Sequence, residues 1–119
     1  MSDSSKMIVE LFREFEKQAL RILVIPHLGA EAVKSIEDEA EFVSYEHSGC
    51  GYFLTVRHRN VSRTRVVCGK PIVAGRVDHT NCGFIAFMEN GHLMLECYGF
   101  GDQSLPKDIR DLNVVVSTT

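Results

Sequence analysis

The sequence contains few prolines and glycines, and it has no long run of apolar residues. Three Pro and nine Gly among 119 residues, with 45% hydrophobic residues, exclude a fibrous or disordered chain. The longest uncharged apolar stretch, residues 22–28, contains Pro26 and His27 and is far shorter than the roughly 20 residues of a membrane-spanning helix. We therefore expect a single globular domain over residues 1–119, since domains of about 100–150 residues are common.

Signals for export and for disulfide formation are also lacking. Residues 1–6 are rich in Ser and carry Asp3, and charged residues interrupt the chain that follows, so that no apolar core of a signal peptide is present. This pattern predicts a cytoplasmic protein with free thiols. The four cysteines are Cys50, Cys68, Cys82 and Cys97.

The spacing of the apolar residues changes along the chain from a helical pattern to a strand pattern. Apolar residues recur every three or four positions over 7–23, which predicts an amphipathic helix with an N-cap at Ser4 or Ser5 and an end before Pro26. A shorter helix is expected over 29–39. After this point, runs of β-branched and aromatic residues predict strands. The strands are expected at 41–47, 52–58, 64–67 with 72–77, 83–89, 92–98 and 112–116.

Because the helices precede the strands, the order of the elements favours an α+β fold. We expect N-terminal helices, within residues 5–39, to pack on one face of an antiparallel β-sheet of about five to six strands, within residues 41–117. The clearest turn is Asn90-Gly91, since these residues adopt the positive φ values that a two-residue hairpin requires.

A short motif, His-x-x-Cys, occurs twice. Two such pairs brought together would supply the four ligands of a tetrahedral zinc site. The alternative is that they are ordinary turn and core residues at the start of two strands, because Cys often behaves as a small buried hydrophobe. We expect no metal and no other cofactor, and the only candidate ligands are His47, Cys50, His79 and Cys82.

The sequence contains no recognisable catalytic motif. A cysteine and a histidine can form a nucleophile pair, but no oxyanion-hole signature accompanies them. The glycines at 99 and 101 lack the third glycine and the Lys of a phosphate-binding loop, and the consecutive acids at 37–39 point in different directions on a helix. We therefore expect a protein that is not an enzyme and has no catalytic residues.

Charge is segregated along the chain although the formal net charge is only -3. The stretch Arg57–Arg76 carries six basic residues and no acid, whereas residues 31–46 are mainly acidic. The small total argues against a general polyanion binder, but the local charges favour electrostatic steering of a charged partner. One interpretation is a nucleic-acid-binding module that uses Arg57–Arg76, and another is that the two segments pair on neighbouring strands.

The segment from Cys82 to Pro106 carries a longer pattern: Gly83-Phe84-Ile85-Ala86-Phe87, then Glu89, Asn90-Gly91 and Leu95-Glu96-Cys97-Tyr98. Upstream, residues 46–53 contain a Gly-x-Gly-aromatic segment at the start of a predicted strand. Together these two segments cover rather less than half of the chain. They resemble segments of small bacterial immunity proteins of polymorphic toxin and contact-dependent growth inhibition systems.

The resemblance implies a protein that binds a cognate toxin domain, often a nuclease, and occludes its active site. Because a nuclease attracts phosphates, acidic side chains are suited to bind it and to accelerate association. We expect a monomer or homodimer that binds the C-terminal domain of a toxin, and neither nucleic acid nor a membrane. The predicted toxin-binding residues are Glu37, Asp38, Glu39, Glu41 and Glu46. The alternatives are the nucleic-acid-binding module and a small zinc-binding protein.

Overall fold

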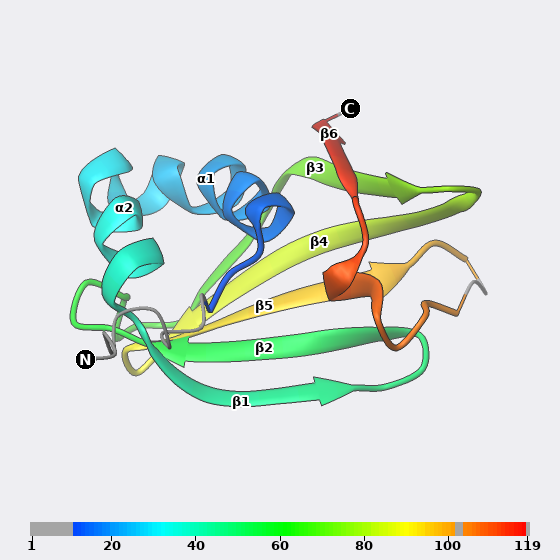
Figure 1. Cartoon of the computed structure of the whole chain (residues 1–119). Helices are drawn as coiled ribbons and strands as arrows, with labels where there is room; N and C mark the ends of the chain where they lie inside the picture. Colours follow the sequence, from blue (N-terminus) through cyan, green and yellow to red (C-terminus); the bar gives the residue numbers. More distant parts are fainter. Residues whose placement is uncertain (1–10, 102–103, 119) are drawn as a thin grey trace, which may run out of the picture.

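The structure, a computed structural model, describes residues 11–101 and 104–118. Two helices are followed by six strands, and Figure 1 shows both helices on the same side of the sheet. All strand pairs are antiparallel, in the order β1-β2-β5-β4-β3-β6. This arrangement confirms the predicted α+β class. The elements are α1 (Glu14–Leu28), α2 (Ala30–Glu39), β1 (Glu41–His47), β2 (Gly51–Arg57), β3 (Val66–Val77), β4 (Thr80–Glu89), β5 (His92–Gly99), the 3-10 helix η2 (Ile109–Asp111) and β6 (Val115–Thr118).

Helix α1 begins and ends later than the apolar periodicity predicted. Its N-cap is Arg13, whose backbone N–H donates to the Glu16 carboxylate at 2.7 Å. The predicted caps at residues 4 and 5 lie outside the described residues. The expected end before Pro26 is wrong, since the helix continues to Leu28 and ends at Gly29, with φ 90°. Pro26 lies inside the helix and lacks the N–H that would donate to the Ile22 carbonyl one turn earlier, yet the helix continues through it for two more residues.

The remaining elements follow the predicted order with three shifts. Helix α2 and strands β1, β2 and β5 lie within one residue of their predicted ranges, whereas β4 begins at Thr80, three residues before its predicted start. The two segments 64–67 and 72–77 form one strand, β3, whose register with β4 shifts between Cys68 and Val73. The last strand begins at Val115 rather than at Leu112, since Leu112 is the C-cap of η2.

One face of the sheet packs against the helices, and this contact forms the core. Side chains alternate along the strands, so that every second residue faces α1, α2 and the segment around η2. Helix α1 lies against β3, β4 and β6. The buried residues of the three central strands on this face are Tyr52, Leu54, Val56, Cys82, Phe84, Ala86, Met88, Leu93, Leu95 and Cys97.

The opposite side of the sheet, which we call the open face, has neither α1 nor α2 over it (Figure 1). Its residues are the alternate set on the same strands, and most of them are half-buried, apart from two buried glycines and two exposed charged residues at the strand ends. On β2, β4 and β5 this set includes Phe53, Thr55, Ile85, Phe87, Met94 and Glu96. Among the described residues, the helices thus cover one face of the sheet and leave the central strands of the other face accessible.

Candidate functional site

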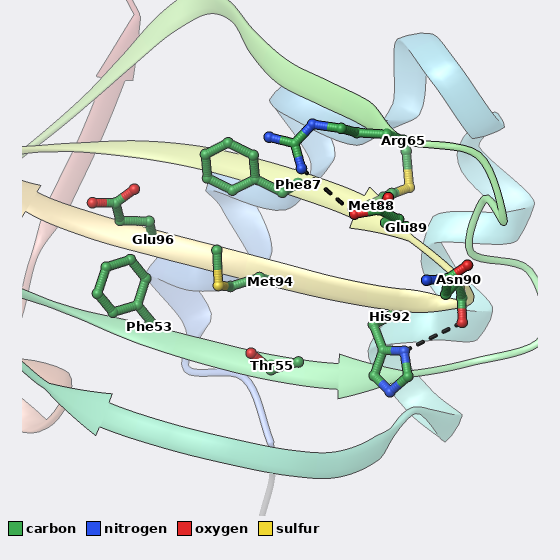
Figure 2. Close-up of a pocket in the computed structure, with 10 residues that line it drawn as sticks. All are labelled: Phe53, Thr55, Arg65, Phe87, Met88, Glu89, Asn90, His92, Met94 and Glu96. Atoms are coloured by element: carbon green, nitrogen blue, oxygen red, sulfur yellow. Dashed lines mark hydrogen bonds and ion pairs between the residues drawn. The ribbon is translucent and has the colours of Figure 1, made fainter.

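A hollow of about 570 Å³ lies on the open face, over β2, β5 and β4 (Figure 2). Phe53, Phe87 and Met94, three apolar residues of the open face, line it together with Met88, which belongs to the covered-face set, and with polar and charged residues. A concave, mainly apolar surface with a few polar groups is the usual form of a binding site. The other lining residues are Thr55, Arg65, Glu89, Asn90, His92 and Glu96.

At the end of the hollow near the 90–91 turn, the charged groups are paired within the chain. The Arg65 guanidinium lies 3.5 Å from the Glu89 carboxylate and 5.9 Å from the centre of the Phe87 ring. The His92 Nδ1 lies 3.2 Å from the Asn90 carbonyl oxygen. This end of the hollow therefore carries little unbalanced charge.

At the other end, the strand register places two carboxylates on either side of an aromatic ring. Glu46 on β1 pairs with Phe53 on β2, and Phe53 pairs with Glu96 on β5. Residues that pair in register project to the same face, so these three form one row across the open face. We call it the Glu46–Phe53–Glu96 row, and Figure 2 shows Glu96 beside Phe53. Within the described part of the chain, neither carboxylate has a hydrogen bond or an ion pair.

The two acids of the row differ in their surroundings. Glu46 is exposed on the edge strand, whereas Glu96 is half-buried on a central strand between apolar neighbours. Burial raises the pKa of Glu96 because the charged form loses hydration. Glu96 was not among the acids that we predicted to bind a toxin. The sequence signal that could have found it is the alternation along residues 92–98, which places Glu96 on the side opposite to its apolar neighbours.

The first of the predicted toxin-binding acids, Glu37, lies buried on α2. Its side chain is only 1% exposed, and the Arg21 Nε and Nη2 atoms donate to its two oxygens at 2.9 and 2.8 Å. This hydrogen bond, above all, raises the pKa of Arg21. Glu37 therefore joins α2 to α1 and does not face outward.

Three further predicted acids are exposed but have a basic partner in the chain. Asp38 lies 3.3 Å from Lys34 one helical turn earlier. Glu39 lies 3.2 Å from the Arg59 Nη2, and the hydroxyl of Ser35 donates to it, which lowers the pKa of Glu39. The remaining pair, Glu41 with the Nε of Arg57, is 3.1 Å apart. Of the five predicted acids, Glu46 is thus the one without a basic partner among the described residues.

The basic stretch Arg57–Arg76 takes part in the same pairs. Arg57 and Arg59 contact the acidic segment, which fits the interpretation that the two segments pair with each other. The Nε of Arg76 donates to the backbone oxygen of Asp78 at 3.2 Å. Binding of nucleic acid by this stretch stays a prediction, and acids of the same chain already balance part of the positive charge that it would use.

The two His-x-x-Cys motifs do not come together as a set of ligands. The Nδ1 of His47 accepts the backbone N–H of Gly49, and Cys82 is buried beside Cys97. The Cys97 thiol donates to Cys82, which lowers the pKa of Cys82 and, together with burial, raises that of Cys97. Over residues 11–101 and 104–118, no group of three or more His, Cys, Asp or Glu side chains is arranged to hold a metal ion.

Ser35, His58 and Glu39 form a polar cluster that has the composition of a hydrolytic triad. The Ser35 hydroxyl lies 3.1 Å from the His58 Nε2 and donates to Glu39 at 3.1 Å. The His58 Nδ1 accepts the backbone N–H of Asn60, so in the neutral ring the proton is on Nε2. An Nε2 that donates to Ser35 cannot remove its proton, and the carboxylate of a triad belongs on Nδ1. This cluster therefore holds α2 to the end of β2.

A scan against protein-family models, a search of curated proteins and a search of solved structures each found no match to the chain. Among the described residues, no helix has the length and apolar character needed to cross a membrane. The open face, with its hollow and the unpaired acids Glu46 and Glu96, is the candidate binding surface.

Proposed function

We propose that this protein is an immunity-type binding protein, which neutralises a cognate toxin domain by holding it against the open face of the sheet. The observation that carries the proposal is the one-sided covering of the sheet, which leaves Phe53, Phe87 and Met94 around a hollow. A contiguous apolar patch rimmed by polar residues is typical of a protein interaction surface. The resemblance of residues 82–106 to immunity proteins favours a toxin as the partner.

The dimensions of the molecule fit a binding surface of ordinary size. Its principal extents are 40 × 39 × 22 Å, so its broad side is large enough for the roughly 800 Å² that one partner contributes to a standard interface. If the active site of the toxin lies within such an interface, the bound inhibitor blocks it sterically and needs no chemistry of its own. The unpaired acids at 46 and 96 favour a basic toxin surface, such as that of a nuclease.

The test is protection from a toxin domain encoded beside this protein. We expect co-expression with the wild-type chain to restore growth and to yield a one-to-one complex. Met94→Lys places a charge at the centre of the open face and should abolish both, because burying an unpaired charge in an interface is costly. Gln18→Lys adds the same charge on the exposed side of α1 and should have no effect.

Thermal unfolding of both variants confirms that they are folded before binding is compared. A wild-type chain that forms no complex with the toxin domain overturns the proposed function. A folded Met94→Lys variant that protects as well as the wild type overturns the use of the open face.

A further inference from the structure

We infer that the Glu46–Phe53–Glu96 row is the receptor for an arginine side chain of the partner. This inference rests on the proposed function, and it names the group that the open face recognises. The ring would stack against the guanidinium, and one carboxylate on each side would accept its N–H groups. The partner is therefore a protein that presents an exposed arginine, in an interface that also covers the apolar hollow.

The geometry of the sheet suits a guanidinium. Neighbouring strands lie about 4.8 Å apart, so the backbones that carry the two carboxylates are roughly 10 Å apart with the Phe53 backbone midway between them. A planar guanidinium has N–H donors on opposite sides and a face that stacks on an aromatic ring. It can therefore contact the ring and both acids together, whereas an ammonium is a more compact point charge.

The charge of the open face is unbalanced at this row. Two other acids on this face have basic partners, Glu41 with Arg57 and Glu89 with Arg65. Glu46 and Glu96 have none among the described residues, so an incoming cation meets two uncompensated negative charges. Because Glu96 is half-buried, its ionised form is held at a cost in free energy that a cation would offset.

The chain already contains the same combination of groups on both faces of the sheet. On the open face, Arg65 lies over the Phe87 ring and pairs with Glu89. On the covered face, Arg110 lies over the rings of Tyr45 and Tyr52 and pairs with Glu16. The Glu46–Phe53–Glu96 row has the acids and the ring of this arrangement but lacks the arginine, which the partner would supply.

The inference is tested with a probe that does not require the toxin. N-acetyl-arginine amide is titrated into the ¹⁵N-labelled protein at low salt, and backbone amide shifts are recorded, with N-acetyl-citrulline amide as the neutral isostere. We expect weak, saturable shifts centred on Phe53 and Glu96 with the arginine compound only, which decrease as salt screens the charges. Shifts that are equal for the two compounds, or that are absent from this row, overturn the inference.

Substitutions in the row separate its acids from its ring. Glu46→Gln/Glu96→Gln should weaken binding of the arginine compound about tenfold, since it removes two charge-assisted hydrogen bonds. Phe53→Leu keeps an apolar side chain but removes the ring, and should weaken it severalfold. Glu31→Gln removes one carboxylate from an exposed position on α2, outside the row, and should leave binding unchanged. Unaltered binding by the double variant overturns the inference.

The same variants distinguish this inference from the proposed function. If the double variant loses at least about tenfold in affinity for the toxin domain, the row acts in the complex as inferred. If it binds the toxin domain as tightly as the wild type, the arginine receptor is wrong and the immunity function stands. If the wild-type chain binds the arginine compound but no toxin domain, the proposed function fails and the partner is another arginine-bearing protein.

Discussion

At the scale of single residues, Glu16 is a buried charge that several segments of the chain satisfy together. It is 0% exposed and accepts hydrogen bonds from the Tyr52 hydroxyl, the backbone N–H of Arg13, and the Nε and Nη2 of Arg110. Burial, followed by the nearby Glu16 charge, raises the pKa of Tyr52 far above its ordinary value, so the hydroxyl keeps its proton and donates a hydrogen bond to Glu16. The carboxylate thereby joins α1, β2 and η2.

Glu16→Gln should lower the free energy of unfolding by about 3 kcal/mol, because it leaves a largely buried Arg110 without its counter-charge. Tyr52→Phe, which removes one hydrogen bond to a charged group, should cost about 1.5–3 kcal/mol. Glu14→Gln is the control, since its exposed carboxylate is 4.0 Å from Arg21 and should change stability by less than about 0.5 kcal/mol. Urea unfolding measures all three, and a Glu16→Gln variant as stable as the control contradicts the argument.

At the scale of elements, the turn between β4 and β5 connects a hairpin to the loop after β2. Asn90 and Gly91 have φ values of 55° and 79°, which agree with the type of turn that the sequence predicted. Their backbone N–H groups donate to the carbonyls of Arg63 and Ser62, and the Gly91 carbonyl accepts from His58. The turn therefore also holds the loop over residues 58–63.

Gly91→Ala should destabilise the protein by about 1–2 kcal/mol, because a Cβ disfavours positive φ. A Cβ there would meet its nearest atoms at 3.7 and 3.9 Å, which is ordinary contact, so the cost is conformational rather than steric. Gly91→Asn is the matched variant, since Asn tolerates this conformation, and it should be the less destabilised of the two. Equal losses for Ala and Asn in thermal or urea unfolding would argue against this explanation.

At the scale of the whole molecule, the strand order determines where the fold is most stable. Strand β5 lies between β2 and β4 at the centre of the sheet, whereas β1 and β6 are the two edges. In addition, β6 is paired with β3 only over the four residues 73–76. An edge strand has one neighbour and opens without disrupting the core.

Amide hydrogen exchange should therefore differ across the sheet. We expect the hydrogen-bonded amides of β5 to exchange only through global unfolding, and those of β1 and β6 to exchange orders of magnitude faster through local opening. Exchange followed by NMR at several denaturant concentrations measures both. Uniform protection across all six strands would mean that the edges are held by contacts beyond those described above.

Patterns over a few residues sufficed for the fold class, most strand positions and the 90–91 turn, because alternation, apolar spacing and glycine conformation are local properties. The start of α1 was missed because its cap involves Arg13 and Glu16, whereas the apolar periodicity extends upstream of them. Its end was missed because Pro26 was read as the stop, whereas the helix ends at Gly29, which has a positive φ.

The candidate site depended on contacts between distant parts of the chain. Alternation alone places Glu96 opposite to its buried neighbours, but it does not tell which face of the sheet the helices cover. Helix packing decided which face is covered, and it also buried Glu37 beside Arg21 and paired Glu39 with Arg59. Strand register brought Glu46, Phe53 and Glu96 into one row. These pairings are non-local, because they depend on how whole strands and helices align. The sequence alone therefore determined the secondary-structure elements, whereas the tertiary structure decided which residues form the binding surface.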